Sequence, residues 1–167
     1  MSKVKFAGNF ITLVGDEVAV GQIAPEFTSV GADLKPVCLK DFDGKVKIIS
    51  VFPSVDTGVC ATQIRTFNKA AADLSKDIVI LNISNDLPFA QKRFCGVEGI
   101  DKAVTISDHK DVEFGTKYGF LIEELRLLAR GVVVIDNNNI IKYVEYVPEV
   151  TTEPNYDAAL EVAKKLV

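Results

Sequence analysis

The sequence lacks the long apolar runs and the basic clusters that mark several common classes of protein. No apolar stretch approaches the ~18 residues that suggest a membrane-spanning helix. Lysine and arginine are spread along a chain with a net charge of −4, so we expect neither nucleic acid nor an acidic membrane surface as the main partner. Residues 1–10 alternate charged and apolar side chains without the apolar core of a secretory signal, which favours a cytoplasmic location.

Cysteine and histidine are also scarce, with three and one residues respectively. Because they are widely separated, we expect neither a zinc nor an iron–sulfur site, and no other cofactor is implied. The Cys-x-x-Cys motif of general disulfide oxidoreductases is absent, which argues against that function. Cytoplasmic thiols are kept reduced, so a cysteine pair there is more often catalytic than structural.

The remaining composition is that of an ordinary globular protein. The chain has 167 residues, 48% hydrophobic and 25% charged, which is enough for one domain with a sizeable core. No repeat or second domain is apparent, so we predict a single domain over residues 1–167. Residues 1–20 are predicted to add an N-terminal β-hairpin, with strands Val4–Phe6 and Phe10–Val14 joined by a Gly-Asn turn.

The most informative stretch is residues 46–60. The β-branched, apolar run from Val46 to Phe52 predicts a buried strand, which Pro53 ends. After a polar turn, apolar residues recur at alternating three- and four-residue spacing, the pattern of an amphipathic helix. Thr57 is a good N-cap, which places Cys60 at the third helical position. The apolar stripe of this helix comprises Cys60, Ile64, Phe67, Ala71 and Leu74.

Two interpretations of Cys60 follow from this placement. The unpaired N–H groups and the positive dipole end of a first helical turn favour a thiolate, and the capping geometry brings the Thr57 hydroxyl close to it. A buried core cysteine is the alternative, because free cysteine is among the most buried residue types and Cys60 lies on the apolar stripe. The local sequence leaves both open.

Strand-like and helix-like patterns alternate along the rest of the chain. Their order resembles that of the thioredoxin-like α/β fold, a three-layer sandwich with a central mixed sheet. Right-handed crossovers make the first two strands of its core parallel neighbours and place the turn with Thr57 and Cys60 at the carboxyl edge of the sheet. The predicted strands are Ile78–Ser84, Ala103–Ile106, Val132–Ile135 and Ile140–Tyr146, and the predicted helices are one from Pro88 to Cys95 with Gly96 as its stop, one over 111–117 and one over 156–167.

The spacing Pro53-x-x-x-Thr57-x-x-Cys60 resembles the active-site signature of the peroxiredoxins. The segment Gly-Gln-Ile-Ala-Pro-Glu-Phe at 21–27 and the Asp-Gly-Lys at 43–45 match that family as well. With Cys95 in the second helix, the chain resembles the atypical two-cysteine peroxiredoxins of the thiol peroxidase type over nearly its full length.

This resemblance implies a role for five residues. Cys60 would be the nucleophile that cleaves the peroxide bond, with Thr57 hydrogen-bonding sulfur and peroxide and Pro53 shielding the pocket from water. Arg130, before the strand Val132–Ile135, would supply the cation, although an arginine at the start of a strand can equally lie on the surface. Cys95 would be the resolving thiol; the alternative is a core cysteine.

The two predicted helices suggest that the disulfide requires movement. Both helices should start at the carboxyl edge of the sheet, but Cys95 lies about seven residues into its helix, an offset on the order of 10 Å at ~1.5 Å per residue. Disulfide formation requires Cα atoms within about 7 Å. We therefore expect unwinding around Cys60, Cys95 or both.

The resemblance also implies substrates and partners. Hydrogen peroxide and organic hydroperoxides would be the substrates, thioredoxin the reductant, a homodimer the assembly and antioxidant defence the role. A peroxide sensor or relay that passes a disulfide to a partner protein remains an alternative, because its first chemical step is the same. Of the other residues considered, Arg65 and Arg126 are weaker candidates for the cation, Cys38 is read as structural, and His109 is placed on the surface.

Overall fold

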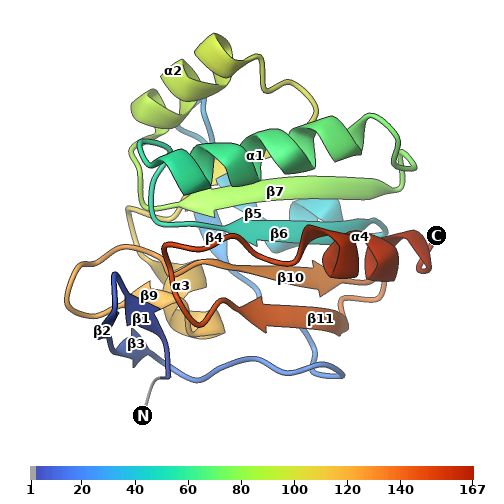
Figure 1. Ribbon diagram of the computed structural model, residues 1–167. Helices are drawn as coiled ribbons and strands as arrows, with labels where there is room; N and C mark the ends of the chain where they lie inside the picture. The colour runs from blue at the N-terminus through green and yellow to red at the C-terminus, as the bar shows by residue number, and fades with distance from the viewer. Residues whose placement is uncertain (1–2) are drawn as a thin grey trace.

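The chain forms a seven-stranded mixed sheet with helices packed against it (Figure 1). The computed structural model describes residues 3–167. The strand order is β11-β10-β6-β7-β8-β4-β5, in which β6, β7 and β8 are parallel and the other neighbours antiparallel. The predicted fold class and the parallel pairing of the first two core strands are thereby confirmed. The elements from residue 28 onward are β4 (Thr28–Val30), β5 (Pro36–Cys38), η1 (Leu39–Phe42), β6 (Val46–Val51), α1 (Gly58–Ala71), β7 (Ile78–Ser84), α2 (Pro88–Glu98), β8 (Val104–Ser107), α3 (Glu113–Tyr118), β9 (Leu121–Ile122), β10 (Gly131–Ile135), β11 (Ile141–Tyr146) and α4 (Tyr156–Lys164).

Strand β6 is buried on both faces because it lies between two layers of the core, and its two polar residues, Lys47 and Ser50, are buried as well. Val46 and Ile48 belong to the cluster that includes Phe67 of α1 and Ala159 of α4. The alternate residues, such as Ile49, belong to the cluster that contains the aromatic side chains of α3. A strand that is covered on both faces is rich in apolar residues along its whole length, and this pattern allowed β6 to be predicted from the sequence. Figure 1 shows α1 lying along β7, with α4 beside β10.

The N-terminal hairpin is shorter than predicted. Strand β1 (Lys5–Phe6) pairs with β2 (Asn9–Phe10), and the turn is Ala7-Gly8, whose φ angles of 51° and 85° suit a hairpin turn of the right twist. The predicted strand over 10–14 is wrong: β3 (Leu13–Val14) is separate and pairs with β9 instead. Residues 1–2 of the predicted hairpin region lie outside the described residues.

Helix α2 is longer than predicted. It continues through Gly96 to Glu98 and ends at Gly99, which has a left-handed φ of 67°. The backbone N–H groups of Gly99 and Ile100 both donate to the Cys95 carbonyl. Gly99 therefore closes the helix, and the predicted stop at Gly96 is wrong. Cys95 therefore lies inside a helix and not at its end.

No helix within residues 3–167 is long and apolar enough to cross a membrane.

Candidate active site

Cys60 lies where β6 passes through a short turn into α1. Thr57 is the N-cap of α1, and its hydroxyl accepts a hydrogen bond from the Cys60 N–H at 3.3 Å. Since Gly58 is the first helical residue, Cys60 is the third, as predicted. Pro53 is buried, Thr57 is exposed, and the Cys60 side chain is 0% exposed. The thiol is thus buried in the first turn of a helix, and Pro53, in the turn that precedes this helix, is buried as well.

Arg130 directly precedes β10, the antiparallel neighbour of β6, and its side chain reaches Cys60. In the antiparallel pair β10–β6, Gly131 lies opposite Val51, so the residue before Gly131 falls at the carboxyl end of β6. There the guanidinium Nη2 donates to Cys60 Sγ at 3.2 Å. Arg130 is only 2% exposed, so the interpretation of a surface arginine does not hold for its position.

The charge of Arg130 is not balanced by an acidic side chain. Its other donors go to neutral oxygens, with Nε 2.7 Å from the Val150 carbonyl and Nη1 2.8 Å from Gln63 Oε1. Among residues 3–167, no carboxylate forms an ion pair with it. A buried cation without an acidic partner attracts a negatively charged group, and Cys60 Sγ is the atom that Nη2 contacts. Nearby, burial raises the pKa of Tyr156 despite the opposing effect of Arg130.

Gln63 holds the guanidinium in place. Its side chain is fully buried, and its Nε2 donates to Ser50 Oγ at 2.8 Å and to the Val51 carbonyl at 3.1 Å. These two bonds turn Oε1 toward Arg130. Sequence reasoning missed Gln63; the available signal was a polar residue adjacent to the apolar stripe, three positions after Cys60 in the same helix.

Asp86 ties the active-site turn to the loop before α2, and it too was missed. Its carboxylate accepts from Ser54 Oγ at 2.7 Å, from the Val55 N–H at 2.9 Å and from Ser84 Oγ at 2.6 Å. A weaker, exposed ion pair between Asp56 and Arg93, at 3.7 Å, joins the active-site turn to α2 itself. The turn that leads to Cys60 is therefore coupled to the start of the helix that carries Cys95.

Cys95 is a free thiol with a different partner. Its Sγ lies 3.4 Å from Thr105 Oγ1 on β8, while Cys60 Sγ is bonded to Arg130. The half-buried residues Phe94 and Ile100 pack against the apolar cluster that contains Cys60. The structure thus brings together Cys60, Thr57, Arg130 and Pro53, and it places Cys95 on the neighbouring helix with its sulfur directed to β8.

The other candidates of the sequence lie elsewhere. Arg65 forms an exposed ion pair with Glu98 at 3.1 Å, and Arg126 is an exposed turn residue with a φ of 55°. Cys38 is half-buried on β5, with its Sγ 3.3 Å from Thr28 Oγ1. His109 is exposed and its Nδ1 lies 2.8 Å from Ser107 Oγ. Within the described residues, no group of three His, Cys, Asp or Glu side chains could hold a metal ion.

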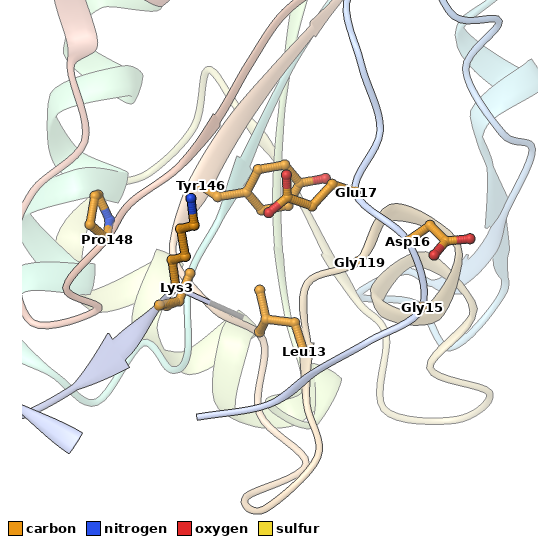
Figure 2. Close-up of a pocket in the computed structure, with 9 residues that line it drawn as sticks. Lys3, Leu13, Gly15, Asp16, Glu17, Gly119, Tyr146 and Pro148 are labelled. Atoms are coloured by element: carbon orange, nitrogen blue, oxygen red, sulfur yellow. The ribbon is translucent and has the colours of Figure 1, made fainter. Parts of the chain in front are cut away.

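A hollow of about 460 Å³ lies beside the N-terminal segment, and no cysteine lines it (Figure 2). Tyr146 lines this hollow, and its hydroxyl accepts a hydrogen bond from the Val18 N–H and donates one to the Tyr118 carbonyl. Burial raises the pKa of Tyr146 to about 12, so this phenol stays neutral. The hollow is separate from the thiol site, and its lining residues are Lys3, Val4, Leu13, Gly15, Asp16, Glu17, Gly119, Tyr146 and Pro148.

A buried cysteine and a buried arginine meet at the carboxyl edge of a thioredoxin-like sheet, and the fold is that of the peroxiredoxins. The peroxiredoxin-like protein from Aquifex aeolicus superposes with a TM-score of 0.92 at 40% sequence identity, over 98% of this chain and 96% of that one.

The chain belongs to the Redoxin family, whose model matches residues 19–160. It is 54% identical over 164 residues to the thiol peroxidase of Halalkalibacterium halodurans, covering 98% of each chain. It is 53% identical over 167 residues to the thiol peroxidase of Bacillus subtilis strain 168, covering 100% of this chain and 99% of the relative. These relatives indicate that the protein is a peroxidase of the thiol peroxidase type, an oxidoreductase.

Proposed function

We propose that the protein reduces hydrogen peroxide and organic hydroperoxides at Cys60, forms a Cys60–Cys95 disulfide, and is reduced again by thioredoxin. The observation that carries this proposal is the 3.2 Å contact between Arg130 Nη2 and Cys60 Sγ in a buried site at a helix N-terminus. A cation without an acidic partner stabilises the thiolate before the reaction and the charge on the departing oxygen during it.

In the first step, the Cys60 thiolate attacks one oxygen of the peroxide. A sulfur–oxygen bond forms, the oxygen–oxygen bond breaks, and the second oxygen leaves as water or an alcohol after taking a proton. Cys60 becomes a sulfenic acid. The exposed Thr57 hydroxyl is the group available to orient the peroxide, and the buried Pro53 ring limits access of water to the sulfur.

In the second step, the Cys95 thiolate attacks the Cys60 sulfur and displaces hydroxide, which leaves as water. Because the two sulfurs have different partners in the reduced protein, we expect unwinding around Cys60, Cys95 or both in this step. The packing of α2 favours movement around Cys95: among the 11 residues of this helix only Pro88 and Gln91 are buried, while Phe89 is 68% and Val97 80% exposed. A helix with so few apolar contacts opens at low cost.

The reductant, the assembly and the location are part of the same proposal. Thioredoxin is the dithiol that would return the disulfide to two thiols, and the relatives' name supports a thiol-dependent cycle. A homodimer and an antioxidant role follow from the family resemblance. A cytoplasmic location fits a cycle that depends on a reducing compartment.

The test is thiol titration and intact mass after one equivalent of hydrogen peroxide, for the parent protein, Cys60→Ser and Cys95→Ser. The parent should lose two thiols as a Cys60–Cys95 disulfide, Cys95→Ser should stop at the sulfenic acid, and Cys60→Ser should be inert. Equal, slow reaction of all three proteins would mean that Cys60 is only a core cysteine. Steady turnover with thioredoxin, in place of a mixed disulfide with one client protein, separates a peroxidase from a sensor.

A further inference from the structure

The N-terminal hairpin is attached to the loop that follows β11. Lys5 of β1 forms a parallel bridge with Glu149 in this loop (Figure 1). The Lys5 N–H donates to the Pro148 carbonyl at 2.8 Å, and the Lys5 carbonyl accepts from the Val150 N–H at 2.8 Å. One residue of the hairpin is thereby joined to both neighbours of Glu149. The hairpin precedes residues 19–160, so it is an addition to the part of the chain that matches the Redoxin model.

The same loop, residues 147–150, closes around Arg130. The Val147 N–H donates to the Arg130 carbonyl at 3.0 Å, and the Arg130 Nε donates to the Val150 carbonyl at 2.7 Å. Val150 is 1% exposed and belongs to the same core cluster as Val4, which directly precedes β1. The acceptor that Arg130 uses on this side therefore lies in a loop that is packed and hydrogen-bonded to the N-terminal segment.

The side chain of Glu149 strengthens this attachment. Its Oε1 accepts from the Gly8 N–H at 2.7 Å, and its Oε2 accepts from the Ala7 N–H at 3.1 Å. Oε2 also accepts from the N–H and the hydroxyl of Thr151, at 3.0 and 2.9 Å. One carboxylate thus bonds the turn of the hairpin and the residue that follows Val150.

We propose that Glu149 is a positioning residue for Arg130 and that it acts through the N-terminal hairpin and the Val150 carbonyl. A guanidinium is a rigid plane, so an acceptor that fixes Nε also sets the direction of Nη2. In this structure Nη2 points to Cys60 Sγ at 3.2 Å. As far as it concerns the reaction of Cys60 with peroxide, the inference rests on the proposed function.

The two anchors of the guanidinium differ in how they are supported. Gln63, which accepts from Nη1, is itself bonded to Ser50 and Val51 of the central strand β6. Val150, which accepts from Nε, lies in a connection between a strand and a helix. The bridge with β1 gives this connection the strand pairing that Gln63 obtains from β6. The hairpin is therefore part of the support of the thiol site.

Hydrogen exchange of the Arg130 Nε–H tests this positioning directly. It is measured by NMR on the reduced, nitrogen-labelled protein, with the signal assigned through bonds to the Arg130 side-chain carbons. A hydrogen-bonded N–H that is buried exchanges when its bond opens, and Arg130 is only 2% exposed. Glu149→Ala should accelerate this exchange roughly two- to tenfold, the factor for the net loss of about one hydrogen bond. Glu149→Gln should lie between this variant and the parent, because the amide keeps one acceptor oxygen.

Glu124→Ala is the matched control. The Glu124 carboxylate accepts from the Thr12 N–H at 2.9 and 3.0 Å, so it also binds the backbone of the N-terminal segment. It lies after β9 and outside the loop of residues 147–150. Exchange of the Arg130 Nε–H should therefore be the same in Glu124→Ala as in the parent.

The rate of Cys60 oxidation by hydrogen peroxide supplies a second measurement. Glu149→Ala should slow it by about the factor seen in exchange, roughly two- to tenfold, and should have no further effect in a chain that carries Arg130→Met. An equal loss in both backgrounds would indicate a general effect on stability and would contradict action through Arg130.

The inference is overturned if the Arg130 Nε–H exchanges equally fast in Glu149→Ala and the parent, or if Glu124→Ala accelerates it as much. Because the exchange measurement needs no peroxide, its result does not depend on the proposed function. Faster exchange in Glu149→Ala, with a parent protein that does not reduce peroxide, would remove the proposed function and keep the positioning of Arg130. Peroxide reduction by the parent, with unchanged exchange in Glu149→Ala, would do the opposite.

Discussion

Removing the guanidinium of Arg130 is the most direct test of the thiol site. Arg130→Met keeps most of the side-chain length and deletes the charge and all donors, whereas Arg130→Lys keeps the charge. A lysine has a single ammonium and cannot donate at once to the Val150 carbonyl, Gln63 Oε1 and Cys60 Sγ, as the guanidinium does. The lysine variant should therefore react at a rate between those of the parent and the methionine variant.

The magnitude follows from the 3.2 Å separation of Nη2 and Sγ. Coulomb's law at an effective dielectric constant of about 20 gives about 5 kcal/mol for unit charges at this distance, an upper bound because desolvation opposes it. Hydrogen bonds to charged groups contribute about 1.5–3 kcal/mol net. Since about 1.4 kcal/mol corresponds to a factor of ten in rate, Arg130→Met should slow Cys60 oxidation roughly 10- to 100-fold.

The assay is the second-order rate of Cys60 oxidation by hydrogen peroxide, followed in single turnover. The same substitution leaves the Val150 carbonyl and Gln63 Oε1 without a donor, at about 1–3 kcal/mol each, so thermal unfolding must show that the variant is folded at the assay temperature. Arg65→Met is the matched control, because Arg65 belongs to α1 but makes only an exposed ion pair with Glu98. Its rate should equal that of the parent.

A folded Arg130→Met protein that oxidises Cys60 as fast as the parent would refute this reasoning. The guanidinium would then be a structural group that holds residue 150 and Gln63, and the thiolate would owe its reactivity to the helix terminus. Equal losses in Arg130→Met and Arg65→Met would also contradict it, because they would indicate a general effect of charge.

Three further predictions concern neighbouring interactions. Gln63→Met should lower the rate of Cys60 oxidation about tenfold by freeing Arg130, in the same single-turnover assay, and an unchanged rate would show that Gln63 does not position it. Hydrogen bonds from the N–H groups of Thr151, Gly8 and Ala7 lower the pKa of Glu149 from 4.5 to about 2. The ionised carboxylate should therefore hold the N-terminal hairpin in place above pH 4.5, and this stabilisation should be lost as the pH falls toward 2. In Glu149→Gln, hydrogen exchange at Gly8 should no longer show this dependence on pH. Burial raises the pKa of Asp108 from 3.8 to about 6, against the bonds it accepts from Phe114 and Gly115, so its ionised form costs stability at neutral pH. Relative to Asp108→Asn, the parent should gain up to about 3 kcal/mol of unfolding free energy as the pH falls from 7 to below 3.8, and a constant difference in denaturant unfolding would contradict this.

The local pattern of the sequence was sufficient for the strand, the turn and the position of Cys60. The strand run, the proline that stops it and the threonine N-cap can each be recognised from residues adjacent in the sequence. The third helical position of Cys60 could therefore be predicted. The direction of crossovers is set by the twist of strands, so the parallel pairing of β6 and β7 followed too. By contrast, Gly96 and Gly99 both lie near the end of α2, and the predicted stop at Gly96 is wrong. Gly99 alone has the left-handed conformation and the closing hydrogen bond.

Only the tertiary structure decided which residues meet the sulfur. Arg130 lies 70 positions from Cys60 and reaches it through the antiparallel register of β10 with β6, which no local pattern contains. The family resemblance pointed to Arg130, but the roles of Gln63 and Asp86 emerged only from their contacts. Their side chains are polar groups that folding has to pair, and the partner of a buried polar group is fixed by the packing of distant segments. The sequence by itself therefore determined where the thiol is, and the packing determined what surrounds it.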